Sequence, residues 1–161
     1  MTIEIGAKLP DATLLKMGEA GAEAVPLAER LKGRRVVIFG LPGAFTSTCS
    51  TAHVPSFIRT APKFVEKGVD EIICVAVNDP FVMKSWGEAT GASAAGITML
   101  ADADSSFSKA IGMTFDVPHL GFFSRSKRYA LLAEDGVVTK FNPEAGPGCE
   151  ISAGETLLAQ I

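Results

Sequence analysis

The 161-residue sequence is poor in the residues that build disulfide scaffolds, metal sites and aromatic binding surfaces. It has three cysteines (Cys49, Cys74 and Cys149), two histidines, one tryptophan and one tyrosine. Three cysteines are too few, and an odd number, for a disulfide framework. The cysteines are spread and the histidines isolated, so we expect no metal site. Ten phenylalanines indicate instead a core rich in Phe.

Neither one sign of charge nor a long apolar run dominates the chain. The net charge is −3 and the basic residues are scattered, which argues against nucleic acid as a partner. The longest apolar stretches, Val36–Pro42 and Ile72–Val77, are too short to span a membrane. The first residues lack a basic segment followed by an apolar one, so we expect no signal peptide and a cytoplasmic protein.

The composition that remains is typical of a globular protein. Hydrophobic residues make up 47% of the chain and charged residues 20%, which argues against disorder. The length fits one domain, so we expect residues 1–161 to form a single domain.

Short apolar runs alternate with helical patterns along the chain. Strands are predicted at 35–40, 71–77, 97–101, 129–133 and 137–141, and an N-terminal hairpin within 6–21. Helices are predicted at 48–67, 81–90, 104–111 and 152–161. Pro55 should kink the first of them, and Ser152 with Glu155 has the pattern of a capping box for the last. The order predicts an α/β fold, a mixed sheet with helices on both faces.

Cys49 follows a strand and a Pro42-Gly43 break, in the first turn of a long predicted helix. The first amides of a helix lack partners and the helix dipole is positive there, and both favour a thiolate. This edge of an α/β sheet is also where ligands bind. A small apolar helix residue is an equally ordinary interpretation of the same position.

Thr46 lies three residues before Cys49, so its hydroxyl is expected to face the sulfur across the turn. An N-cap role is the ordinary alternative for a threonine there, although Ser47 and Thr48 compete for it. The chain has no Cys-x-x-Cys pair, which argues against a disulfide oxidoreductase.

Pro42-x-x-x-Thr46-x-x-Cys49 matches the active-site motif of peroxiredoxins, which have a thioredoxin-like fold. The longer run 42–50, followed by 53–55, resembles the type II (atypical, peroxiredoxin-5) subfamily. The resemblance continues through 77–83 and 126–132 to the C-terminus and so covers nearly the whole chain. Ser47 departs from the family pattern, which usually has a second proline there, so the rigidity of the turn is expected to differ.

The resemblance implies a thiol-dependent peroxidase that reduces hydrogen peroxide and alkyl hydroperoxides without a cofactor. It assigns Cys49 as the nucleophile that becomes a sulfenic acid, and Thr46 as the group that aligns the peroxide. Pro42 would shield the site from water. Arg128 would supply positive charge at the sulfur; only the resemblance selects it among the arginines.

His53 lies four residues after Cys49 on the same helix face. A Cys–His dyad is the tempting interpretation, but the helix end and an arginine already favour the thiolate. The resemblance gives His53 no direct chemical role, so we expect structural packing.

Two cysteines are candidates for resolving the sulfenic acid. Cys74 lies 25 residues after Cys49 in an apolar strand, and a buried, inert cysteine is the simpler interpretation. Cys149 follows Gly146-Pro147-Gly148 in an expected exposed loop, about two residues early for the resolving position of some relatives. The alternative is a one-Cys cycle in which glutathione, glutaredoxin or thioredoxin attacks Cys49 directly.

Two further functions would use the same cysteine, a redox relay and a thiol–disulfide exchange protein. Type II relatives commonly associate through surfaces near the active site, so a homodimer is expected. Phe45, Phe81 and Trp86 are the candidate contacts.

Overall fold

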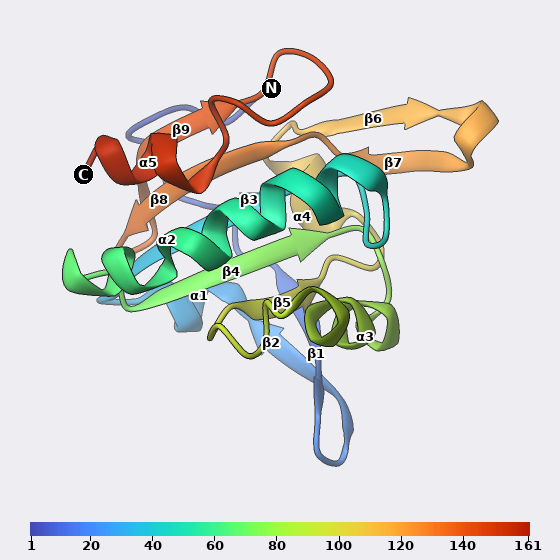
Figure 1. Cartoon of the computed structure of the whole chain (residues 1–161), viewed down its shortest axis with the longest axis horizontal. Coiled ribbons are helices and arrows are strands. Elements are labelled where there is room, and N and C mark those ends of the chain that lie inside the picture. Colours follow the sequence, from blue (N-terminus) through green and yellow to red (C-terminus); the bar gives the residue numbers. More distant parts are fainter.

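A seven-stranded sheet forms the centre of the computed structural model, which describes residues 1–161 (Figure 1). The strands lie in the order β2-β1-β5-β4-β3-β8-β9. β3, β4 and β5 run parallel, and all other pairings are antiparallel. Their bounds are β1 Thr13–Gly18, β2 Gly21–Pro26, β3 Arg35–Gly40, β4 Glu71–Ala76, β5 Thr98–Ala101, β8 Tyr129–Glu134 and β9 Val137–Pro143.

Helices cover both faces of this sheet, as predicted. α2, α3 and α5 pack on one face, and α1 and α4 pack on the other. Their bounds are α1 Leu27–Leu31, α2 Val54–Glu66, α3 Pro80–Thr90, α4 Ser106–Ala110 and α5 Gly154–Ala159. No helix is long and apolar enough to cross a bilayer. The arrangement confirms the expected thioredoxin-like α/β fold.

The central strand β3 supplies both layers of the core because successive side chains point to opposite faces. Val37 and Phe39 belong to the cluster under α2, while Val36 and Ile38 belong to the cluster on the other side. Phe39 stacks on Phe57 of α2 with ring centroids 4.1 Å apart. Burial on both faces explains why the strand is an unbroken apolar run.

The helix predicted for residues 48–67 has two parts. It begins with a π-helical turn, η1 (Cys49–His53), and continues as α2 from Val54. Pro55 lies in the first turn of α2, where a backbone amide has no partner within the α-helix. The irregularity therefore precedes Pro55, and the structure shows a change of helix type where we expected a kink inside a continuous helix. π-turns inside helices are frequent at functional sites.

A second, two-stranded sheet was missed by the sequence analysis. β6 (Thr114–Val117) and β7 (Phe122–Ser126) form an antiparallel ribbon joined by a short 3-10 turn, η2 (Pro118–Leu120). The ribbon projects beyond the main sheet in Figure 1. Its strands are short and only partly buried, so their hydrophobic pattern is weak. This ribbon forms one wall of a cavity that Arg128 also lines.

The predicted capping box at the C-terminal helix is wrong. α5 begins at Gly154, and its N-cap, Ala153, makes no side-chain cap. The Ser152 hydroxyl donates to the Glu144 carboxylate at 2.6 Å, and Glu155 pairs with Arg59. The Ser152 and Glu155 side chains therefore bond to residues that lie outside the helix, and not to the first turn of the helix.

Candidate active site

The loop between β3 and η1, residues 41–48, is held by contacts from three directions. Ala44 N donates to the side-chain oxygen of Asn78, which follows β4, at 2.9 Å. Arg125 Nη1 donates to the Pro42 carbonyl at 3.0 Å. A Cβ on Gly43 would collide with that guanidinium, so any other residue there would require the Arg125 side chain to shift. These contacts fix the loop at the carboxyl edge of the parallel strands, where ligands bind in α/β sheets.

Cys49 is the first residue of η1, and its side chain has no exposed surface. Arg128 Nη2 donates to its Sγ at 3.3 Å, although the two residues are 79 positions apart. Arg128 immediately precedes β8, and the next residue, Tyr129, pairs with Gly40 at the end of β3. The antiparallel pairing of β3 with β8 therefore brings the arginine to the cysteine.

The positive charge of Arg128 is not neutralised by a carboxylate. The ion pairs of the molecule involve other arginines, and no Asp or Glu oxygen lies within ion-pair distance of Arg128. Only 9% of the residue's surface is exposed, and charge interactions are stronger where water is excluded. The guanidinium therefore brings a positive charge without a carboxylate partner to the sulfur of Cys49.

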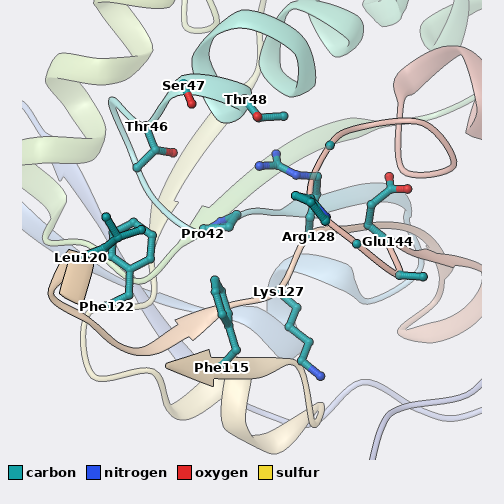
Figure 2. A pocket seen from close by; sticks show the side chains of 14 residues that line it. Pro42, Thr46, Ser47, Thr48, Phe115, Leu120, Phe122, Lys127, Arg128 and Glu144 are labelled. Carbon is teal, nitrogen blue, oxygen red and sulfur yellow. The ribbon is translucent and has the colours of Figure 1, made fainter. Parts of the chain in front are cut away.

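A cavity of about 710 Å³ opens beside Arg128 (Figure 2), and the fully buried Cys49 lies behind its lining. Pro42, Thr46 and Thr48 line it beside Arg128. Its opposite wall is apolar and comes from the β6–β7 ribbon, through the side chains of Phe115, Leu120 and Phe122. Polar groups at one end and an apolar wall at the other suit a small molecule with a reactive polar head.

Thr46 lies at this cavity, but its hydroxyl makes no hydrogen bond to Cys49. It donates instead to the Gly43 carbonyl at 2.7 Å. A hydroxyl has one proton and two acceptor lone pairs. With its proton directed to Gly43, the Thr46 oxygen is left as an acceptor for a group in the cavity.

His53 has more contacts at this site than the sequence analysis expected. Its Nδ1 lies 3.0 Å from Arg128 Nη1, and its Nε2 lies 3.0 Å from the Ser152 carbonyl. Burial, together with the nearby Arg128 charge, lowers the pKa of His53 to about 3. The available signal was its position four residues after Cys49, on the same helix face.

Cys74 lies in the middle of β4, with no exposed surface. Burial, and next the nearby Cys49, raise the pKa of its thiol well above the usual range. A buried cysteine of this kind is inert, which agrees with the simpler interpretation of its sequence position.

Cys149 is half-buried rather than freely exposed, and its sulfur lies 3.7 Å from the Ser152 hydroxyl oxygen, whose proton is directed to Glu144. Burial raises the pKa of the Cys149 thiol. The Glu144 carboxylate accepts from the amides of Glu150, Ile151 and Ser152 and so closes the turn around it. The loop is thus more ordered than the sequence analysis expected.

Trp86, expected at a dimer surface, is fully buried, and its Nε1 donates to the Ser50 hydroxyl at 3.0 Å. Phe45 and Phe81, by contrast, are 58% and 67% exposed. The π-turn carrying Cys49 is therefore supported from inside by Trp86, which is not available as a surface contact. No three His, Cys, Asp or Glu side chains come together as a set of metal ligands.

A buried cysteine in contact with an arginine on a thioredoxin-like fold suits a thiol enzyme, and the comparisons with known proteins identify the family. The Redoxin family model matches residues 4–158. Peroxiredoxin-2E-2, chloroplastic, of Oryza sativa subsp. japonica is 45% identical over 164 residues, covering 99% of this chain and 73% of the relative.

Solved structures agree with this match. Reduced Prx3 of Vibrio vulnificus in complex with hydrogen peroxide superposes with a TM-score of 0.94 at 47% identity, covering 99% of both chains. Peroxiredoxin 5 of Alvinella pompejana superposes with a TM-score of 0.85 at 30% identity, covering 98% of this chain and 96% of that one.

The chain belongs to the peroxiredoxin family, and within it to the type II, peroxiredoxin-5-like group. It is a thiol-dependent peroxidase, an oxidoreductase whose substrate is a peroxide.

Proposed function

We propose that Cys49 is the nucleophile that reduces the peroxide. The observation that carries this is the buried contact of 3.3 Å between its sulfur and Arg128, beside the cavity. The thiolate attacks one peroxide oxygen, forming the S–O bond while the O–O bond breaks. The leaving oxygen takes a proton and departs as water or an alcohol, and Cys49 becomes a sulfenic acid.

The remaining roles follow from the positions of the groups around the sulfur. Arg128 stabilises the thiolate and the negative charge that develops on the departing oxygen, and it cannot lose its proton. Thr46, with its proton directed to Gly43, accepts the peroxide O–H and aligns the molecule. Pro42 covers the approach of bulk water from the cavity side.

The proposed substrates are hydrogen peroxide and alkyl hydroperoxides. The Vibrio vulnificus Prx3 structure contains hydrogen peroxide, which supports the first. The apolar wall of Phe115, Leu120 and Phe122 supports the second, because it offers a surface for the organic part of the substrate.

For the return of Cys49 to its reduced state we propose a one-Cys cycle with an external thiol. Glutathione with glutaredoxin, or thioredoxin, would attack the sulfenic acid, releasing water and forming a mixed disulfide that a second thiol cleaves. Cys74 is buried, and Cys149 is half-buried with a raised pKa. Resolution by Cys149 would require its turn, held by Glu144, to open first.

Mass spectrometry of the peroxide-treated protein tests both the role of Cys49 as the nucleophile and the one-Cys cycle. A sulfenic acid trapped on Cys49, with no Cys49–Cys149 disulfide, is the expected product. Cys49→Ser should abolish peroxide consumption, with Cys74→Ser as the matched control that retains it. Undiminished turnover in Cys49→Ser would end the assignment, and a Cys49–Cys149 disulfide in the monomer would replace the one-Cys cycle by internal resolution.

A redox relay would use the same cysteine but transfer oxidation to a partner. Continuous turnover with glutathione and glutaredoxin, or with thioredoxin and its reductase, favours the peroxidase. A single stoichiometric oxidation that ends in a trapped mixed disulfide with another protein would favour the relay.

We also propose that residues 1–161 act as one domain and associate as a homodimer in a reducing compartment such as the cytoplasm. The exposed Phe45 and Phe81, on the segments that follow β3 and β4, support an interface at the active-site edge. Three free cysteines suit reducing conditions. Light scattering of wild type and of a Phe45→Ser, Phe81→Ser double variant tests the dimer, and a monomeric mass for the wild type would remove it.

A further inference from the structure

One buried imidazole connects the cysteine site to the C-terminal segment of the chain. His53 has no exposed surface and lies at the end of the π-turn that Cys49 begins. Its two nitrogens contact Arg128 and the Ser152 carbonyl, each at 3.0 Å. Both polar atoms of the ring are therefore satisfied inside the protein.

The chemistry of the two partners fixes the protonation of the ring. Arg128 can only donate, so Nδ1 of His53 must accept. A carbonyl can only accept, so Nε2 must carry the proton and donate to Ser152. Only the neutral Nε2–H tautomer satisfies both contacts, and the lowered pKa of His53 agrees with it.

Aromatic neighbours hold the ring in this orientation. The ring centroids of Phe39 and Phe57 lie 5.0 and 5.7 Å from the imidazole centroid. Their planes are tilted against the imidazole plane by 54° and 53°, respectively. Phe39 comes from the central strand β3 and Phe57 from α2. The acceptor nitrogen therefore points at Arg128 from a rigid support, which is what a precise site requires.

We infer that His53 is a positioning residue for the peroxidase reaction, a neutral acceptor that holds the guanidinium of Arg128 against the sulfur of Cys49. Arg128 uses Nη1 for His53 and Nη2 for Cys49, so the imidazole fixes the rotation of the guanidinium plane. The inference rests on the proposed role of Cys49.

A neutral acceptor performs a task here that a carboxylate could not. A carboxylate on Nη1 would hold the guanidinium as well, but it would neutralise the charge that the thiolate and the departing oxygen need. The imidazole orients Arg128 and leaves its full positive charge for the sulfur. Glu144 is the nearby carboxylate, and its oxygens are taken by the Ser152 hydroxyl and by backbone amides.

Two amide substitutions separate the two contacts of His53. In His53→Asn the amide oxygen occupies the place of Nδ1 and still accepts from Arg128, while the bond to Ser152 is lost. In His53→Gln the longer amide occupies the place of Nε2 and still donates to Ser152, while the acceptor for Arg128 is lost. Both remove the imidazole from its contacts with Phe39 and Phe57, so the loss of aromatic packing is common to the pair.

The expected results differ for the two variants. His53→Gln should lower the second-order rate constant for peroxide by about 10- to 100-fold and move the thiolate titration of Cys49 to higher pH. His53→Asn should retain the rate within about threefold and leave that titration near its wild-type position. The titration is followed by alkylation rate against pH in a Cys74→Ser, Cys149→Ser background, with thermal unfolding as the check on folding.

Equal losses of rate in the two variants, or a His53→Gln protein with wild-type rate and titration, would overturn the inference and leave His53 a packing residue. If both fold poorly, the same titration in Arg128→Lys, which keeps the charge but not the two-pronged geometry, must show the same upward movement. The Cys49→Ser measurement tests the proposed function separately from the role of His53, because retained activity in that variant would remove the proposed function itself.

Discussion

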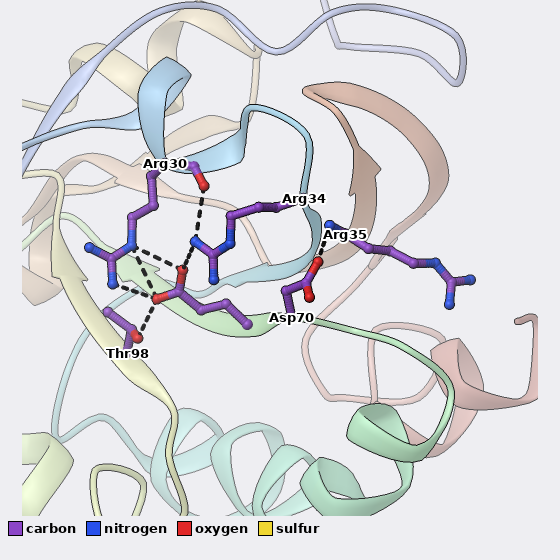
Figure 3. A network of polar contacts seen from close by, with 6 residues as sticks. Arg30, Arg34, Arg35, Asp70 and Thr98 are labelled. Atoms are coloured by element: carbon purple, nitrogen blue, oxygen red, sulfur yellow. Dashed lines mark hydrogen bonds and ion pairs between the residues drawn. The ribbon is translucent and has the colours of Figure 1, made fainter.

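The two ends of the central sheet both contain arginines, and they treat the charge in opposite ways. At the amino ends of β3 and β4, Arg30 and Arg34 converge on the Glu71 carboxylate at 2.6 and 3.0 Å (Figure 3). At the other end, Arg128 contacts a cysteine sulfur and a neutral imidazole. The first cluster pairs its arginines with a carboxylate, whereas the second leaves Arg128 without one.

The carboxylate at the first cluster is fully engaged. Glu71 accepts from Arg30, Arg34 and the Thr98 hydroxyl, and Arg35 beside it pairs with Glu134. Partial burial opposes ionisation of Glu71, but the bonds from Arg30 and Thr98 outweigh it and lower its pKa. Such a cluster ties the segments before β3 to β4 through a fully engaged carboxylate, whereas Arg128 has no carboxylate partner.

The largest effect on the peroxide reaction should come from removing the positive charge of Arg128. Arg128→Ala should lower the rate constant for peroxide by at least about 100-fold, because the thiolate and the departing oxygen lose the cation that contacts the sulfur. Stopped-flow peroxide reduction measures it, with Arg30→Ala as the matched arginine control, expected within about twofold of wild type. Similar losses in the two variants would erase the distinction between the clusters.

Removing the carboxylate of the first cluster should instead affect the stability of the fold. Glu71→Gln should lower the free energy of unfolding by about 2 kcal/mol, since it leaves two arginines without their anion. Urea unfolding measures this, and Glu155→Gln, which breaks the exposed pair with Arg59, should cost less than about 0.5 kcal/mol. A slower peroxide reaction in folded Glu71→Gln would show that the two ends are coupled.

Acid should destabilise the protein through His53, at the end of the sheet where Arg128 lies. The pKa of His53 is about 3 in the native protein and about 6.5 when unfolded, so the unfolded chain binds a proton that the native protein does not. The contribution of neutral His53 to the free energy of unfolding is fully present above about pH 6.5. It is lost as the pH falls toward 3, by about 1.4 kcal/mol per pH unit. Chemical unfolding between pH 7 and 4.5 should show this slope, and His53→Asn should flatten it. If the slope of unfolding free energy against pH is unchanged in His53→Asn, a group other than His53 causes the pH dependence.

The smallest effect concerns the carboxylate that lies near Arg128 without pairing with it. Partial burial opposes ionisation of Glu144, but hydrogen bonds from Ser152 and from the Glu150 amide outweigh it and lower its pKa. Glu144→Gln should loosen the turn and raise the labelling rate of Cys149 by a few-fold. The peroxide rate should change little, and a large loss would mean that Glu144 also acts on Arg128.

The strands, the helices and the motif could be predicted from the sequence because their signals are local. The run 35–40 is β3 as predicted, and the hairpin of β8 and β9 was placed within two residues. Predictions failed where a distant partner decided the outcome. Ser152 bonds to Glu144 rather than capping α5, Trp86 turns inward to Ser50, and the exposed ribbon of β6 and β7 has too weak a pattern to detect.

The sequence by itself determined the class of the protein and the cysteine at its centre, because Pro42, Thr46 and Cys49 lie in one short segment that a family motif describes. The tertiary structure decided what surrounds that cysteine. Arg128 reaches the sulfur across 79 positions because β3 pairs with β8, and His53 meets Ser152 across 99 positions because the C-terminal segment folds onto α2. Contacts of that range depend on strand pairing and packing, which no local pattern encodes.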